Sequence, residues 1–304
     1  MGTTVLNSGT TIVIITHVIG GLGNQMFQYA VGRALSLARE VPLLLDTQDF
    51  EGYTLHNGFE LHRIFNIDAQ LANTRDVRQV LGWRAFSPLR RKLFHKKFVK
   101  FRGKHLFVDS LSNHRYYLEN MSDTCYLMGN WQSERYFEQV ADTIRADFSF
   151  KVLPLGRNAE LAELIGKTTV VSLHVRRGDI ASNPASLVVH GLCSLDYYRR
   201  AIEYVTAKVA KPEFVIFSDD MAWVRENLNV DYPCHYVDHN MGLESCNDMR
   251  LMSLCHHHII ANSSFSWWGA WLNPNMNKIV VAPQRWFAVN YDSSDIVPSS
   301  WIKM

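Results

Sequence analysis

The sequence predicts an α/β protein made of two Rossmann-like domains that face each other across a cleft. Apolar runs of strand length alternate with segments of helix length in both halves of the chain. A glycine-rich turn separates the first strand from the first helix, as in many parallel β-α-β units. The length of 304 residues favours two domains, which we expect to span residues 1–150 and 151–304.

The first half begins with an apolar run that reads as a buried strand. Strand, helix and strand then follow in the order of a parallel β-α-β unit. Residues 66–120 carry no motif that we can place. The expected elements are a strand over 12–19, a helix over about 26–40, a strand ending at Asp46, a strand over 125–132 and a helix over 133–148 that Ser133 caps.

The second half repeats the alternation more clearly. Ligands in such folds bind beyond the carboxyl ends of the strands, so the residues that follow each strand are candidates for a site. The expected strands are 168–175, 213–220, 234–239, 257–262 and 278–283. The expected helices are 194–209, 221–228, 247–255 and 265–272.

Composition limits the function classes. A net charge of +2 is too small for a general nucleic-acid-binding protein, so any anion binding must be local. The five cysteines form no C-x-x-C pair, which favours free thiols in a reducing compartment. The apolar run 11–21 is too short to span a bilayer, and it lacks the flanking features of a signal peptide.

The octapeptide SLHVRRGD, residues 172–179, closes a strand with two adjacent arginines. Successive strand residues point to opposite faces, so His174 and Arg176 share one face, while Arg177 continues the face that is apolar upstream. A guanidinium is costly to bury without a partner, and its planar fork suits a phosphate. We therefore predict that Arg176 faces an anion. The alternative is an arginine that pairs with Asp179 at the strand end without any ligand.

The segment GGLGNQ, residues 20–25, is similar to the G-x-G-x-x-G turn of dinucleotide-binding proteins. Met26 stands in place of the third glycine, which argues against nicotinamide or flavin binding. A tight turn with no ligand is a second interpretation. We favour a site, because Asn24 and Gln25 would lie at a helix N-terminus, where amides and N–H groups can hold an anion or a hydroxyl.

The tripeptide SDD, residues 218–220, ends another expected strand. Two adjacent carboxylates there could bind a metal together with a nucleotide, or one could cap the next helix. No other acidic cluster lies nearby in the sequence. We favour capping and support of the site.

The segment ANSSFSWWGAWL, residues 261–272, places small hydroxyl residues between an apolar strand and a helix. Ser263, Ser264 and the N–H groups near Phe265 and Ser266 would then lie at a helix N-terminus, which attracts phosphate. The alternative is a serine-capped helix with no ligand. In either case, the three tryptophans at 267, 268 and 271 are expected in the core.

Other motifs give little support for metal or hydrolase chemistry. Three consecutive histidines, 256–258, diverge in direction on a regular element, so a shared metal ion is not expected. The P-loop, G-x-S-x-G and H-E-x-x-H motifs are absent from the sequence.

Residues 83–105 contain nine Lys or Arg and no acidic residue. If the segment were helical, Leu89, Leu93, Phe94, Phe98 and Phe101 would fall loosely on one face and leave a basic face opposite. A solvated surface helix is one interpretation. The other is an amphipathic contact with an anionic membrane or with a lipid-linked acceptor.

Taken in order, GGLGNQM, VSLHVRRGD, the SDD strand end and ANSSFSWWGAWL resemble the α-1,2-fucosyltransferases of glycosyltransferase family eleven. The resemblance covers the chain from about Ile12 to Trp301. It implies a GT-B-like fold, with the acceptor side in 1–150 and GDP-fucose binding in 151–304. It also implies an inverting enzyme that moves L-fucose from GDP-β-L-fucose to O2 of a terminal galactose, with no metal or other cofactor required.

More distant α-1,6- and protein O-fucosyltransferases are similar at the H-x-R motif, and the likeness implies further roles. Arg176 would hold the β-phosphate with His174 beside the nucleotide, and Asp248 would recognise guanine. Asn24 would face the sugar and the pyrophosphate. The implied donor-binding residues are Gly23, Asn24, His174, Arg176, Asp219, Asp248, Asn262, Ser263, Ser264, Phe265 and Ser266.

The mechanism implied by the resemblance follows from charge. Negative charge develops on the departing GDP as the C1–O bond of fucose breaks, and fixed donors stabilise it. Arg176, Asn24 and Asp179 are the candidate catalytic residues. Asp179 and His190 are candidate bases for the acceptor hydroxyl, and the base is left unassigned.

Two other functions stay open: another GDP-fucose-dependent transferase, such as an α-1,6 enzyme, or a non-catalytic nucleotide-sugar-binding protein. The expected partners are GDP-fucose and a galactoside glycan, with a lipid-linked glycan as one option, and no nucleic acid. Animal members carry a membrane anchor, which we do not expect in this chain. We therefore expect a cytoplasmic protein of the bacterial O-antigen type, with peripheral inner-membrane contact through 83–105.

Overall fold

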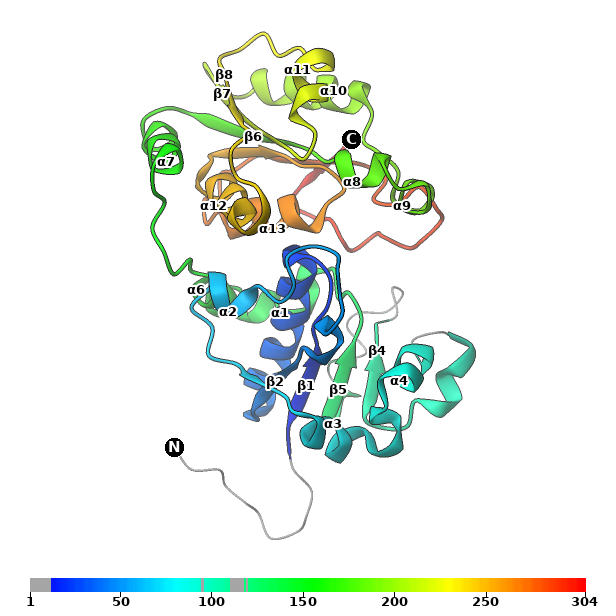
Figure 1. Ribbon diagram of the computed structural model, residues 1–304. Helices are drawn as coiled ribbons and strands as arrows, with labels where there is room; N and C mark the ends of the chain where they lie inside the picture. The colour runs from blue at the N-terminus through cyan, green and yellow to red at the C-terminus, as the bar shows by residue number, and fades with distance from the viewer. Residues whose placement is uncertain (1–11, 94–95, 110–117, 119) are drawn as a thin grey trace. The chain divides into compact units, whose positions relative to one another are not determined.

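A computed structural model describes residues 12–93, 96–109, 118 and 120–304 (Figure 1). The chain forms two compact units, Met1–Ser149 (unit 1) and Phe150–Met304 (unit 2). Each unit is an α/β body with its own parallel sheet. Within the described ranges, no helix is both long and apolar enough to cross a bilayer.

Over its described residues, unit 1 contains a five-stranded sheet. Its strands are β1 (Ile14–His17), β2 (Leu43–Asp46), β3 (Gln70–Leu71), β4 (Leu106–Val108) and β5 (Cys125–Met128). Its helices are α1 (Leu22–Arg39), α2 (Leu61–Ile64), α3 (Thr74–Leu81), α4 (Ser87–Leu93) and α6 (Ala141–Asp147). Its 3-10 helices are η1 (Gln48–Phe50), η2 (Gly82–Ala85), η3 (Lys96–Phe101), η4 (Glu134–Tyr136) and η5 (Glu138–Val140).

The strand order of unit 1 is β3-β2-β1-β5-β4, and all neighbours are parallel. The face that carries Val13 and Ile15 is covered by α3 and α4 through Val77, Val80 and Leu93. α1 packs on the opposite face, where a side chain at Gly32 would collide with Thr16. Both faces are therefore covered, which explains why β1 and β5 are buried along their whole length.

Unit 2, which is described without a gap along its backbone, contains a six-stranded sheet. Its strands are β6 (Val170–Val175), β7 (Glu213–Ser218), β8 (Cys234–Val237), β9 (His257–Ile259), β10 (Val280–Ala282) and β11 (Ile302–Lys303). Its helices are α7 (Arg157–Lys167), α8 (Gly178–Ala181), α9 (Pro184–His190), α10 (Leu195–Thr206), α11 (Met221–Asn227), α12 (Cys246–Leu254) and α13 (Ser264–Leu272), with η6 at Gly242–Ser245.

The sheet of unit 2 has the order β11-β10-β9-β6-β7-β8 and is parallel throughout. α10 and α11 cover one face, and α7 and α12 cover the other (Figure 1). The tryptophans of α13 are buried against one another, with Trp267 and Trp268 in edge-to-face contact at 4.9 Å. The sequence prediction that they belong to the core is confirmed.

The single helix expected over 133–148 is wrong. Ser133 does act as a cap, because its Oγ accepts from the N–H of Arg135, but the backbone leaves the helical region at Phe137, where φ is −141°. Tyr136 packs on Trp131, while the neighbouring Phe137 packs on Phe27. Burial of these two adjacent rings in different surroundings divides the segment into η4, η5 and α6.

The single amphipathic helix considered for residues 83–105 is also wrong. The segment forms η2, α4 and η3, and Phe94 lies outside the described residues. Leu93 is buried, but Phe98 and Phe101 are exposed. The apolar residues therefore do not form one buried face.

Candidate functional site

Each sheet contains a point at which the strand order reverses. In unit 2 the chain runs from β6 through β7 to β8 and then returns to β9 on the other side of β6. In unit 1 the same reversal separates β1 from β5. Open α/β sheets bind ligands beyond the carboxyl ends of the strands at such switch points. The segments that follow β6 and β9, and those that follow β1 and β5, are therefore the candidate sites.

Arg176 and Asp219 follow the adjacent strands β6 and β7 and form an ion pair. Nε of Arg176 lies 3.3 Å from Oδ2 of Asp219, and both side chains are partly exposed. The other carboxylate oxygen, Oδ1, accepts from the N–H of Arg177 at 2.8 Å. One carboxylate thus orients the guanidinium of Arg176 and the backbone beside it.

Arg177 is directed to a different place from Arg176. Its Nε lies 3.4 Å from Asp220, and its guanidinium lies over the ring of Trp223 on α11 at 4.2 Å. Asp220 also caps α11 by accepting from the N–H of Trp223. The capping role expected for the SDD segment is confirmed. The pairing considered between an arginine and Asp179 involves a side chain that lies outside the described part of the structure.

The predicted separation of the two faces of β6 is confirmed. Leu173 and Val175 pack with α10 and α11. His174 lies on the opposite face, where its ring centroid is 6.2 Å from that of Phe265 on α13. His174 is therefore placed between the end of β6 and the first turn of α13.

Gly178 permits close packing of the turn after β6 on the end of β7. A Cβ at this position would lie 2.8 Å from the carbonyl oxygen of Asp219. Asp179 follows in α8, but its side chain lies outside what the structure describes.

The serine-rich turn after β9 caps α13. Oγ of Ser263 accepts from the N–H of Phe265 at 3.3 Å. Ser266 is buried, and its hydroxyl donates to the carbonyl of Ser263 at 3.4 Å. Ser264 and Phe265 remain partly exposed. Of the four predicted contact residues, Ser266 is therefore turned into the protein, and Ser264 and Phe265 present the helix N-terminus.

Asn262 holds two loops together. Its Nδ2 donates to the carbonyls of His190 and Trp286 at 2.9 and 3.2 Å, and its Oδ1 accepts from the thiol of Cys193 at 3.4 Å. Both ends of the amide are used within the protein, so Asn262 would support a donor site by positioning these loops.

The candidate base His190 ends α9 and is exposed. Its ring centroid lies 5.7 Å from that of Phe287. Both residues line a pocket of about 450 Å³ at the ends of β9 and β10, together with Tyr197, Asn262 and Arg285.

Asp248 lies in the first turn of α12 within a chain of amides. Its Oδ1 accepts from Nδ2 of Asn240 at 2.8 Å. Asn240 and Asn158 exchange two hydrogen bonds, and Nε2 of His239 lies 2.9 Å from Oδ1 of Asn158. Burial raises the pKa of Asp248 to about 7, although the Asn240 hydrogen bond opposes the shift. A carboxyl with this pKa near neutrality is sensitive to a hydrogen-bond donor brought by a ligand.

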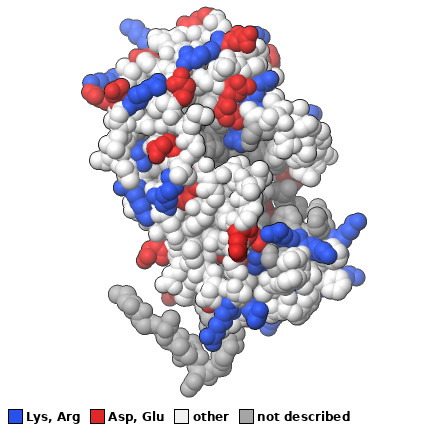
Figure 2. Space-filling model, viewed as in Figure 1, with Lys and Arg blue, Asp and Glu red and all other residues white. Residues whose placement is uncertain are grey.

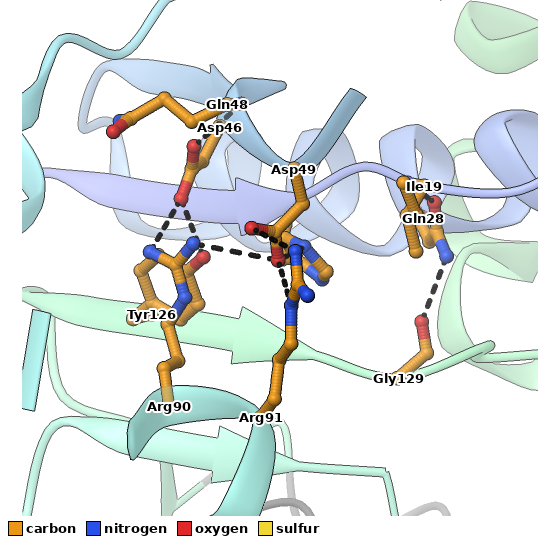
Figure 3. A network of polar contacts seen from close by, with 10 residues as sticks. Ile19, Gln28, Asp46, Gln48, Asp49, Arg90, Arg91, Tyr126 and Gly129 are labelled. Atoms are coloured by element: carbon orange, nitrogen blue, oxygen red, sulfur yellow. Dashed lines mark hydrogen bonds and ion pairs between the residues drawn. The ribbon is translucent and has the colours of Figure 1, made fainter. Parts of the chain in front are cut away.

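The switch point of unit 1 is bridged by two amide side chains of α1. Asn24 is partly exposed, and its Oδ1 accepts from Nε2 of Gln132, which follows β5, at 2.8 Å. Gln28 is buried: its Oε1 accepts from the N–H of Ile19, and its Nε2 donates to the carbonyl of Gly129 (Figure 3). Asn24 thus lies partly exposed at the reversal point, and the buried Gln28 connects the loop after β1 to the loop after β5.

Gln25 does not join Asn24 as a ligand-binding amide. It is completely buried, and its Nε2 donates to the carbonyls of Gly20 and Gly58 while its Oε1 accepts from the N–H of Glu60. Gly20 has a φ of +90°, and a side chain there would meet the amide of Asn24. α1 begins at Leu22, earlier than predicted, so Gly23 and Asn24 lie in its first turn.

The three histidines 256–258 have separate structural roles. Nδ1 of His256 accepts from the N–H of Val170, and Nδ1 of His257 accepts from the N–H of Ile279. His258 is buried between Ser172 and Asn273. Among the residues that the structure describes, no group of three or more His, Cys, Asp or Glu could hold a metal ion.

The predicted residues therefore fall into distinct groups. His174, Arg176, Asp219 and the turn 262–266 gather at the β6–β9 reversal and the adjacent end of β7, whereas Asp248 is held by its own amide network in α12. Gly23 and Asn24 belong to unit 1. Gln28, Gln132, Asn158 and Asn240 were not predicted, because a lone amide in a loop or helix carries no signal until its partner is known.

Comparisons with known proteins identify the family of the chain. The family model for glycosyl transferase family 11 matches residues 6–304. An α-1,2-colitosyltransferase of Escherichia coli is 35% identical over 300 residues, which cover 96% of this chain and 99% of the relative. The O-antigen biosynthesis glycosyltransferase WbnK of Escherichia coli is 33% identical over 301 residues, which cover 94% and 98%.

A solved structure supports the fold. The crystal structure of the fucosyltransferase NodZ from Bradyrhizobium is similar with a TM-score of 0.54 and 15% sequence identity, over 87% of this chain and 93% of that one. The GT-B-like α/β class predicted from the sequence is thereby confirmed. Because the family model spans almost the whole sequence, the chain belongs to glycosyl transferase family 11 and is a glycosyltransferase.

Proposed function

We propose that this glycosyltransferase moves L-fucose from GDP-β-L-fucose to O2 of a terminal galactose, with inversion at C1 of the sugar. The observation that carries the proposal is the oriented guanidinium of Arg176 at the β6–β9 reversal, one strand from the capped N-terminus of α13. A guanidinium and a helix N-terminus both favour a diphosphate. The motifs HVRRGD and NSSFSWWGAWL, which resemble those of α-1,2-fucosyltransferases, support fucose as the sugar.

The proposed chemistry depends on where charge develops. Breaking the C1–O bond leaves positive charge on the sugar ring and negative charge on the β-phosphate of GDP. Arg176 and the first turn of α13 would stabilise that negative charge more in the transition state than in the ground state. The pair with Asp219 already orients the guanidinium, so little reorganisation is needed when the bond breaks.

Asp248 would recognise the guanine base in this proposal. Guanine offers N1–H and an amino group to a carboxylate, and the Asn240 amide keeps one carboxylate oxygen in place. Arg176 would supply the positive charge that a metal supplies in other glycosyltransferases, so we expect full turnover in the presence of a chelator. Activity that disappears with EDTA and returns with a divalent metal would contradict this part.

The decisive experiment is incubation of the purified protein with GDP-fucose and lactose, followed by linkage analysis of the product. We expect fucose α-linked to O2 of galactose. Fucose at any other position, such as an α-1,6 linkage, would contradict the proposal. Binding of GDP-fucose without transfer to any galactoside would favour a binding protein instead.

Colitose is a second candidate sugar, because a relative that matches 96% of this chain is named as an α-1,2-colitosyltransferase. Colitose is L-fucose without the hydroxyl at C3. A site that hydrogen-bonds this hydroxyl would reject GDP-colitose by about 10⁴-fold or more, whereas an apolar surface at that point would discriminate by about 10² at most. Measuring kcat/KM for both donors with one acceptor therefore assigns the sugar, and a higher value for GDP-colitose would replace fucose in the proposal.

A further inference from the structure

Five large apolar side chains of unit 1 are exposed close together in the sequence. They lie in or beside η2 and η3, and their exposed fractions run from 37% to 68%: Trp83, Phe86, Phe98, Val99 and Phe101. These five side chains are not part of the hydrophobic core of this unit, which is formed by residues of α3, Leu93 and the strands. Exposed apolar side chains gathered in this way are typical of a contact surface.

Exposed basic side chains lie among them. Arg91, Lys92, Lys97, Lys100 and Lys104 are exposed, and the segment 83–105 contains no acidic residue. Figure 2 shows Lys and Arg gathered over the part of unit 1 that contains α4. The net charge of +2 becomes −7 when the nine basic residues of this segment are left out, so the positive charge of the molecule is concentrated here. We call these five apolar and five basic side chains the basic aromatic surface.

Contacts within the segment join its three short helices. The guanidinium of Arg84 lies over the ring of Trp83 at 4.5 Å, and its Nε donates to the carbonyl of Phe101 at 2.5 Å. Nε of Arg102 donates to the carbonyl of Leu93 at 2.9 Å. The rings of Phe98 and Phe101 lie 6.4 Å apart. These contacts join η2 to η3, and η3 to α4.

A buried polar network fastens this structure to the sheet (Figure 3). Arg90 on α4 is buried, and its Nη1 lies 2.8 Å from Oδ2 of Asp46 at the end of β2. The hydroxyl of Tyr126 donates to the same oxygen at 2.6 Å. The next residue, Arg91, reaches Oδ1 of Asp49 at 3.1 Å. These bonds hold one side of α4 against the sheet, so the exposed side chains of the segment stay directed to solvent.

From these observations we propose that the basic aromatic surface binds an anionic lipid bilayer. Lysines attract anionic headgroups, and aromatic rings favour the boundary between headgroups and acyl chains. Because the rest of the chain is net negative, an anionic membrane would attract this side of unit 1 more strongly than the rest of the protein. The protein would then be held at the membrane in one orientation, whichever sugar it transfers.

The test is co-flotation of the full-length protein with vesicles of phosphatidylcholine, with and without phosphatidylglycerol, at low and high salt. We expect binding that requires phosphatidylglycerol and weakens with salt. The charge variant Lys97→Glu/Lys100→Glu/Lys104→Glu should lower the partition coefficient by about a hundredfold. The apolar variant Trp83→Ser/Phe86→Ser/Phe101→Ser should remove the binding that survives at high salt.

A matched control reverses three exposed lysines of unit 2, as Lys167→Glu/Lys208→Glu/Lys211→Glu. It changes the net charge by the same amount and should keep vesicle binding. Circular dichroism and thermal unfolding establish that each variant is folded.

Three results would overturn the proposal: equal binding to neutral and anionic vesicles, equal loss in the charge variant and the control, or no vesicle binding at all. If the protein bound single-stranded RNA but not vesicles, the surface would be assigned to RNA. If it formed dimers that were lost in the apolar variant, the surface would be assigned to a second copy of the chain. Because flotation needs no donor or acceptor, its outcome is separate from that of the transfer assay.

Discussion

Nε of Arg176 lies 3.3 Å from Oδ2 of Asp219, across the carboxyl ends of two adjacent parallel strands. Both side chains are partly exposed, so the pair contributes at most about 1 kcal/mol to stability. The main effect of the pair is to orient the guanidinium of Arg176, because the contact at Nε restricts the rotation of this planar group. The adjacent Arg177 is held separately by Asp220 and Trp223. Two neighbouring arginines thus allow a test in which only one should affect catalysis.

Arg176→Ala should lower kcat with GDP-fucose by about a hundredfold or more, because in the proposed mechanism it removes a charge that acts on the departing phosphate. Arg177→Ala should leave kcat within about tenfold and instead lower the stability of unit 2, because it removes a cation–π contact and an ion pair. Steady-state kinetics and urea unfolding of both variants check this. Equal losses of kcat in two folded variants would contradict the proposed role of Arg176 as the arginine that acts on the phosphate.

Asp248 should release a proton when GDP binds below neutral pH. Burial raises its pKa to about 7, so the carboxyl is mostly protonated at pH 6. Donors from a guanine base would stabilise the ionised form and lower this pKa. Calorimetry at pH 6 in two buffers of different ionisation enthalpy should show this release, and Asp248→Asn should abolish it and weaken binding. The exposed Asp196→Asn serves as the control, and an unchanged proton count in Asp248→Asn would refute the assignment.

The same shift has a defined effect on the stability of the free protein. The pKa of Asp248 is above its ordinary value of 3.8, so between 3.8 and about 7 the folded state holds a proton that the unfolded chain has released. The contribution of this residue to stability therefore falls as the pH rises through that window. Urea unfolding should show that wild type loses stability relative to Asp248→Asn between pH 4 and pH 7, and a constant difference between the two would contradict the linkage.

The sequence was a good guide where one local rule decides the structure. Strand alternation separated His174 from Arg177, and the acid after β7 was correctly expected to cap α11. Three tryptophans on an apolar helix could only be core.

Side chains that act through distant partners could not be predicted in this way. Gln25 and Gln28 are alike in the sequence, yet Gln25 binds the 58–60 loop while Gln28 bridges β1 and β5 across the switch point. Only the tertiary structure brings Gly58 and Gly129 to them. The break at Phe137 has the same origin, because it depends on which rings surround the chain.

His258 should make the protein less stable in acid. It lies fully buried between Ser172 and Asn273, and burial lowers its pKa well below the ordinary 6.5. The folded state keeps the ring neutral, while the unfolded chain takes up a proton below pH 6.5. The contribution of His258 to the free energy of unfolding is therefore complete above pH 6.5 and is lost as the pH falls. Urea unfolding should show that the difference in free energy of unfolding between wild type and His258→Gln decreases as the pH is lowered from 7.5 to 5. His56→Gln, at an exposed site, should show no such trend, and a constant advantage over His258→Gln would rule out the linkage.

Asp46→Asn should destabilise unit 1 by about 3–5 kcal/mol, because it leaves the buried guanidinium of Arg90 without its nearest carboxylate. Replacing the whole group with apolar residues, as Asp46→Leu/Arg90→Met/Tyr126→Phe, should recover most of that loss, since no charge or hydroxyl then remains buried without a partner. Equilibrium unfolding in urea measures both variants. If the triple variant had no higher free energy of unfolding than Asp46→Asn, this expectation would be wrong. The charges of the network would then stabilise the fold more than apolar packing can. The triple variant keeps Leu93 in the core and Arg91 paired with Asp49, so α4 should stay attached to the sheet and vesicle binding should persist.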